Sequence, residues 1–168
     1  RAGNIPSSDL SFSITTGKLI SGGEISSVTV YVYYEWDSFT PLACLEDAIS
    51  VIWDEDFIFK ENSFTAKHYS FADSLTEALS QPDEQNQQGL GWYIDLQNSS
   101  AGSYGSGHFS LLPKASLQDG TTYLSQVIAN YGHKKLPFQG ISLSAEDFGV
   151  QIINDDASCA ASSSFRHD

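Results

Sequence analysis

Three consecutive acids, Asp54, Glu55 and Asp56, form the densest group of potentially reactive side chains in this sequence. Calcium takes carboxylate oxygens as ligands and tolerates the irregular geometry of loops. The three acids therefore predict a metal site, with calcium as the candidate cofactor. The same run is also typical of a solvated turn into the segment that follows, because Asp is common in turns. Both interpretations are open at this point.

A second group of acids lies beside aromatic residues. Glu35 and Asp37 flank Trp36. Two carboxylates near aromatic rings are the ingredients of glycoside hydrolysis, in which the distance between the carboxylates in space decides the chemistry. A small secreted hydrolase is therefore one alternative function.

The histidines and serines do not form a recognisable catalytic pattern. The four histidines have no spacing typical of metal ligands: His68, His108, His133 and His167. The run Tyr104 to His108 (YGSGH) lacks the first glycine of a nucleophile elbow. We therefore assign no catalytic residue, and the sequence favours a binding protein over an enzyme.

Aromatic side chains offer a different function. Tyr31, Tyr33 and Trp36 lie in one strand-like segment. Exposed aromatic rings on a sheet bind sugar rings or partner proteins, so these three residues are the candidate ligand-binding residues. The alternative is that a second layer of the protein covers them as ordinary core.

The segment that carries these rings, Ser26 to Trp36 (SSVTVYVYYEW), is rich in residues that favour strands. Val28, Val30 and Val32 alternate with Thr29 and Tyr31, which predicts one aliphatic face and one aromatic, polar face. Similar short segments follow along the chain, with turn signals about every ten residues. The pattern predicts an all-β fold, an antiparallel β-sandwich of about nine or ten strands.

Two segments depart from this pattern. The spacing of Phe71, Leu75 and Leu79 predicts at most one short helix near residues 71–81, which ends at Pro82. The run from Asn98 to Gly107 (NSSAGSYGSG) predicts a flexible hairpin tip.

Length and charge limit the possible partners. The chain has 168 residues and a formal net charge of -13, with eight Lys and Arg residues. Nucleic acid is excluded as a partner because binding phosphates requires a basic patch. No apolar run approaches the roughly 20 residues of a transmembrane helix. We expect a single domain over residues 1–168 with flexible tails at about 1–9 and about 155–168.

The chain begins at Arg1 and contains no Met, as a mature form cut from a secreted precursor would. Cys44 and Cys159 then predict a disulfide, because a cysteine pair in an exported protein is commonly bridged. Two buried thiols are the alternative.

Three segments, AISVIWDEDF (Ala48 to Phe57), QGLGWYIDL (Gln88 to Leu96) and GHFSLLPK (Gly107 to Lys114), resemble small secreted proteins of Gram-positive bacteria that are themselves uncharacterised. The resemblance covers about residues 26–153. It implies export and a β-rich fold, and it transfers no functional residue.

These observations favour a secreted, non-catalytic β-sandwich that binds an extracellular protein, a glycan or a component of the cell envelope. The hydrolase remains an alternative. A secreted toxin or pore-forming subunit is a further alternative, because membrane-inserting hairpins also alternate as Thr121 to Tyr131 does. The ligand and the oligomeric state are open.

Overall fold

The computed structural model describes backbone and side chains of residues 10–37, 47–70, 74–95, 103–114 and 125–132. It also describes the backbone of residues 3–4, 46, 124, 133, 141–142, 151–152 and 157–166. These residues form strands and turns with no helix among them, so the all-β prediction is confirmed.

The first sheet, which we name sheet A, has six strands. Their order across the sheet is β1 (Gly3–Asn4), β14 (Ala157–Arg166), β11 (Leu124–His133), β4 (Glu46–Trp53), β9 (Gly89–Asp95) and β8 (Glu84–Asn86). Every pair is antiparallel except β1 with β14.

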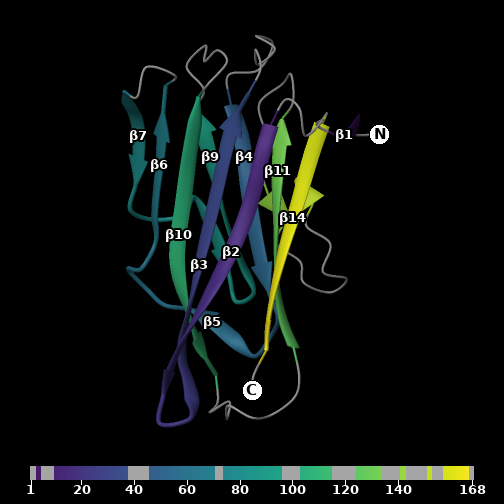
Figure 1. Cartoon of the computed structure of the whole chain (residues 1–168). Helices are drawn as coiled ribbons and strands as arrows, with labels where there is room; N and C mark the ends of the chain where they lie inside the picture. The colour runs from purple at the N-terminus through teal and green to yellow at the C-terminus, as the bar shows by residue number, and fades with distance from the viewer. Residues whose placement is uncertain are drawn as a thin grey trace.

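The second sheet, sheet B, packs face to face with sheet A (Figure 1). Its strands, in order, are β2 (Leu10–Ser21), β3 (Glu24–Trp36), β10 (Tyr104–Pro113), β6 (Thr65–Tyr69) and β7 (Leu75–Leu79), and β5 (Phe57–Phe59) also pairs with β10. A further short pair joins β12 (Ile141–Ser142) to β13 (Gln151–Ile152). Nine of the strands have five or more residues, in keeping with the predicted sandwich.

The core lies between the sheets and follows the period of two that strands impose. On β3, the inward side chains from Val28 to Trp36 are at most 2% exposed, whereas those between them are partly or largely exposed. Sheet A contributes three inward groups to the same core: Ile49, Val51 and Trp53; Leu90, Trp92 and Ile94; and Val127, Ala129 and Tyr131.

The prediction of a short helix near residues 71–81 is wrong in the part that the structure describes. Leu75–Leu79 form strand β7, which pairs with β6 with an irregular register between His68 and Tyr69. Leu79 lies opposite Ala66 and packs against the core. Leu75 lies opposite Tyr69 and is 53% exposed, so the two leucines do not form one apolar face. Pairing with the unpaired edge of β6 therefore overrides a weak helical signal.

Parts of the two expected tails lie in sheet A. Ala157–Arg166, within the expected tail, forms β14 along the full length of β11, and Gly3–Asn4 pairs with β14. The run ASCAASSSFR contains small, polar residues with weak strand preference. The strand forms because β11 offers ten residues of backbone donors and acceptors for pairing.

A membrane-spanning helix is not found in the part of the chain that the structure describes.

Candidate binding surface

The outward face of β3 carries the tyrosines that the sequence singled out. Tyr31 is 44% exposed, Tyr33 is half-buried, and both point away from the core. The predicted division of this strand into an aliphatic face and an aromatic, polar face is therefore confirmed.

The sheet register places further rings beside these two. On β10, Tyr104 and His108 share the outward face, with His108 opposite Tyr31 on β3. On β6, Tyr69 lies opposite Tyr104. We name this set the aromatic patch: Tyr31, Tyr33, Tyr69, Tyr104 and His108. Tyr69, Tyr104 and His108 were not among the residues predicted from the sequence.

The rings of the patch form two stacked pairs across neighbouring strands. The centroids of Tyr31 and His108 are 6.1 Å apart with planes at 7°. Those of Tyr69 and Tyr104 are 5.1 Å apart with planes at 12°. Cross-strand contacts of this kind stabilise one geometry of the side chains, so the patch presents pre-arranged rings.

The patch is nearly neutral within an acidic chain. Its three rows of paired residues contain one carboxylate, Glu35, and one ammonium group, Lys67. A second carboxylate, Asp37, lies at the edge of the patch and accepts a hydrogen bond from Ser11 Oγ at 3.1 Å. The Tyr33 hydroxyl donates a hydrogen bond to Glu35 Oε1 at 2.8 Å. Partial burial and this carboxylate raise the pKa of Tyr33 to about 12, so the hydroxyl stays protonated. The surface is therefore aromatic and polar without a strong field of either sign.

Two glycines of β10 lie beneath the patch and leave room for core side chains. Gly105 and Gly107 point inward, and a Cβ atom on Gly107 would lie 2.6 Å from the Trp92 ring. A Cβ atom on Gly105 would meet Tyr34 and the Lys67 carbonyl oxygen. The predicted hairpin tip is therefore wrong for residues 104–107, since these glycines leave room for core aromatic rings inside a strand.

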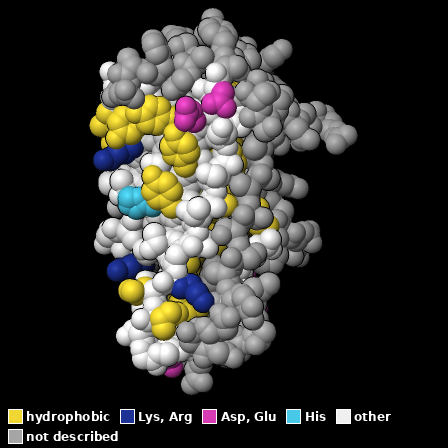
Figure 2. All heavy atoms as spheres, in the orientation of Figure 1, with side chains coloured by type: hydrophobic (Ala, Val, Ile, Leu, Met, Phe, Trp, Pro, Cys, Tyr) yellow, Lys and Arg dark blue, Asp and Glu magenta, His cyan; other side chains and the backbone are white. Residues whose placement is uncertain are grey.

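In the space-filling view, hydrophobic side chains gather over the upper part of this face of sheet B, beside a histidine and two acids (Figure 2). Polar side chains and backbone separate them from a smaller apolar group lower on the same face.

Trp36, the third predicted ligand-binding residue, does not belong to this surface. It is 2% exposed and points inward, because it is an odd number of residues from Tyr31 and Tyr33. Its indole Nε1 donates to the Tyr131 hydroxyl at 3.1 Å, and that hydroxyl donates to the buried carboxylate of Asp47. Burial raises the pKa of Tyr131 well above its usual value. Trp36 thus joins the two sheets.

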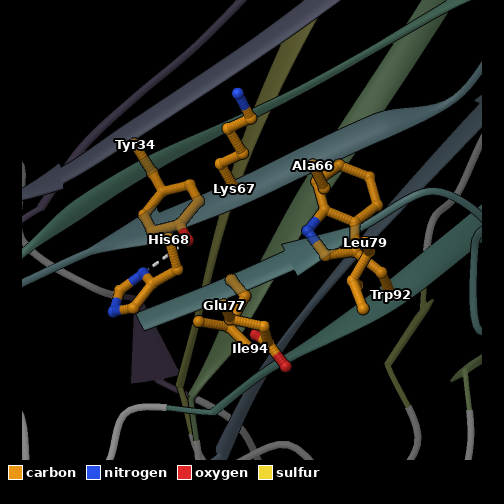
Figure 3. A pocket seen from close by; sticks show the side chains of 8 residues that line it. All are labelled: Tyr34, Ala66, Lys67, His68, Glu77, Leu79, Trp92 and Ile94. Carbon is orange, nitrogen blue, oxygen red and sulfur yellow. Dashed lines mark hydrogen bonds between the residues drawn. The ribbon is translucent and has the colours of Figure 1, made fainter. Parts of the chain in front are cut away.

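A small pocket lies between β6, β7 and β9, and Figure 3 shows its lining. The Tyr34 hydroxyl and Nδ1 of the buried His68 are 2.7 Å apart. Burial lowers the pKa of His68 to about 4, so the ring is neutral at pH 7. The empty volume is about 160 Å³, below the roughly 300 Å³ at which pockets for small molecules begin. The lining therefore serves packing between the sheets.

The acids predicted to bind calcium lie in the turn between β4 and β5. The Asp54 carboxylate accepts hydrogen bonds from the backbone N–H groups of Asp56 at 3.1 Å and Gln126 at 3.4 Å. Among the residues with described side chains, no three His, Cys, Asp or Glu residues gather as metal ligands. The alternative of a turn is confirmed for Asp54 to Asp56, and the calcium site remains a prediction.

The predicted disulfide falls outside the described residues on one side. Cys44 is not described, and Cys159 is described only as backbone on β14, where it pairs with Tyr131. The bridge between Cys44 and Cys159 therefore stays a prediction.

Comparison of the whole fold with solved structures identifies several similar domains. The collagen-binding subdomain of the Enterococcus faecalis surface protein ACE matches with a TM-score of 0.50 at 10% identity, covering 97% of each chain. The collagen-binding domain of a Staphylococcus aureus adhesin matches with a TM-score of 0.53 at 8% identity, covering 90% of this chain and 95% of that one.

This chain has the fold of those bacterial surface domains. The major pilin subunit of Bacillus cereus also matches, with a TM-score of 0.53 at 6% identity, over 94% of this chain and 40% of the pilin. No protein-family model matches the sequence, and no curated protein matches it significantly. The resemblance to Gram-positive secreted proteins is thus supported in its β-rich fold.

Proposed function

We propose that this chain is an extracellular, non-catalytic binding domain, and that a collagen-type protein segment binds on the outer face of sheet B. The observation that carries the proposal is the aromatic patch, in which two stacked ring pairs project from neighbouring strands. Aromatic side chains are enriched at the centres of protein interfaces.

The chemistry of the patch suits a ligand rich in proline. Chains in the polyproline II conformation dock their rings against aromatic side chains, and a collagen triple helix winds three such chains together. The rows of the patch carry one positive and one negative side chain, Lys67 and Glu35. A neutral Gly-Pro-Hyp repeat approaches this face without the repulsion that a polyanion would meet from a chain of net charge -13.

Two of the similar solved domains support the proposal, since their names describe collagen binding. Their identity to this chain is 10% or less, so the ligand is proposed from the surface chemistry together with the fold. The same comparison supports an extracellular location, because one domain comes from a surface protein and the other from an adhesin.

The test measures binding of a synthetic triple-helical Gly-Pro-Hyp peptide by surface plasmon resonance. We expect Tyr31→Ala and Tyr104→Ala each to weaken binding about tenfold, the loss that truncation of a central interface ring causes. The matched control is Tyr93→Ala, a half-buried tyrosine on the outward side of β9 in sheet A, which should bind as the wild type does.

Glycans serve as the second arm of this experiment. Binding of a glycan at the aromatic patch, with no binding of the triple-helical peptide, would show that the ligand class is wrong. Equal binding by wild type, Tyr31→Ala and Tyr104→Ala would show that the surface is wrong.

A further inference from the structure

We propose that the collagen-type ligand makes a second contact on the same face of sheet B, at a row of aliphatic side chains toward the other end of the strands. This inference rests on the proposed function and extends it. The aliphatic row consists of Leu19 on β2, Leu112 on β10 and Ile58 on β5.

The register of four strands defines this row. Leu112 lies opposite Ile58, and Leu19 lies opposite Ser27 on β3. The pairing of Leu111 with Val28 places the next residue, Leu112, beside Ser27. The three aliphatic side chains therefore cross the sheet in one line with Ser27 between two of them.

Two of the three side chains of the row are exposed, and Leu112 is half-buried. Leu19 is 62% exposed and Ile58 is 40% exposed, two of the five large hydrophobic side chains that are exposed in the described residues. Leu19 lies on the β2–β3 hairpin, which extends below the other strands of sheet B in Figure 1. The apolar group low on the face in Figure 2 lies in this region.

The aromatic patch and the aliphatic row share their strands. Tyr104 and Leu112 are eight residues apart on β10, which corresponds to about 26 Å along a strand. Between the two sites lie Gly17, Thr29 and Ser110, which are small. A ligand in the polyproline II conformation spans the same distance with about eight residues. The near edge of the patch, His108, is only four residues from Leu112, or about 13 Å. A stiff rod parallel to the strands therefore contacts both sites along its length.

Charge favours the collagen-type ligand over a second copy of this chain. The aliphatic row and the three small residues beside it carry no charge themselves, and Lys or Arg side chains lie next to the lower apolar group in Figure 2. A second copy would bring a net charge of -13 against an equal charge, whereas a Gly-Pro-Hyp triple helix brings none.

The experiment uses the full chain and the triple-helical Gly-Pro-Hyp peptide. We expect the double variant Leu19→Ser with Ile58→Ser to bind about tenfold more weakly, because two apolar side chains lose their contact with the ligand. The matched control is Ile20→Ser, because Ile20 is on the same hairpin, pairs with the inward residue Ile25 and points to the other face. Thermal melts establish that each variant is folded.

Three outcomes are distinguishable. Weaker binding by the double variant, with Ile20→Ser unchanged, supports the second contact. Unchanged binding by the double variant, with Tyr31→Ala impaired, overturns the second contact and leaves the proposed function standing. No binding of the peptide by the wild type overturns both proposals.

Discussion

The outer faces of the two sheets differ although the strands beneath them have the same alternating pattern. On sheet A, the outward residues Ala48, Ser50 and Ile52 of β4 are fully buried. On sheet B, the outward residue Tyr31 of β3 is 44% exposed. The short strands β12 and β13, which form a separate pair, lie close to β4 of sheet A.

This difference shows which face is available to a ligand. Ser50 Oγ is buried without a hydrogen-bond partner, an exception to the usual pairing of buried polar groups, and it is closed off from solvent on this face. Sheet B instead keeps its outward aromatic rings accessible. A partner that needs an open sheet therefore has access to sheet B, and four predictions test this contrast.

The largest effect on stability is expected when a carboxylate is introduced on the outer face of sheet A. The same kind of substitution on the outer face of sheet B is the comparison. Ile52→Asp on sheet A buries a carboxylate, and we expect it to lower the free energy of unfolding by about 4 kcal/mol or to prevent folding. Thr29→Asp on sheet B leaves the carboxylate in water and should cost less than about 1 kcal/mol. Urea denaturation measures both, and similar losses would contradict the contrast.

The second prediction concerns the pH dependence of stability. It compares a histidine in the interior of sheet B with a histidine on its surface. Burial lowers the pKa of His68 from 6.5 to about 4, with the Asp95 carboxylate acting in the opposite direction. The unfolded chain therefore takes up this proton first as the pH falls. The contribution of neutral, buried His68 to the free energy of unfolding is complete above pH 6.5 and is lost as the pH falls to 4.

The magnitude of this loss is about 3 kcal/mol. The variant His68→Gln keeps an acceptor for the Tyr34 hydroxyl and should lack this component of the pH dependence. Parallel stability profiles for wild type and variant between these pH values would contradict the assignment. The control is His108→Gln, which changes the exposed face of the same sheet.

The third prediction compares neighbouring residues of β10. Gly107→Ala forces a methyl group against the Trp92 ring and should cost about 1–3 kcal/mol. The Ser106 side chain points to the outer face, so Ser106→Ala should change the free energy of unfolding by less than about 0.5 kcal/mol. Thermal denaturation measures both values, and a neutral Gly107→Ala would show that the interior beneath the patch adjusts.

The smallest effect on stability is expected within the patch itself. Tyr31→Ala removes the stacking on His108 and should cost about 0.5 kcal/mol, while it impairs binding of the triple-helical peptide. This combination separates a binding residue from a core residue. A loss comparable to that of Ile52→Asp would mean that Tyr31 serves the fold.

Part of the candidate binding surface could be predicted from local sequence. Tyr31 and Tyr33 are recognisable because they alternate with valines, and alternation on a strand follows from backbone geometry. The same alternation applied to Trp36 places it with the valines, which would have removed it from the predicted surface. The outward set Tyr104, Ser106 and His108 was also present as a pattern, although Gly105 and Gly107 made it resemble a loop.

The sequence by itself determined the all-β class and the two faces of β3, because side-chain branching and a period of two are local properties. Tertiary structure decided that Leu75–Leu79 is a strand and that Ala157–Arg166 pairs with β11, since backbone pairing with a neighbour outweighs weak local preference. It also decided that Tyr69 meets Tyr104 and that Ala48 is covered while Tyr31 is not. Register and coverage depend on segments distant in the chain, and no local pattern contains them.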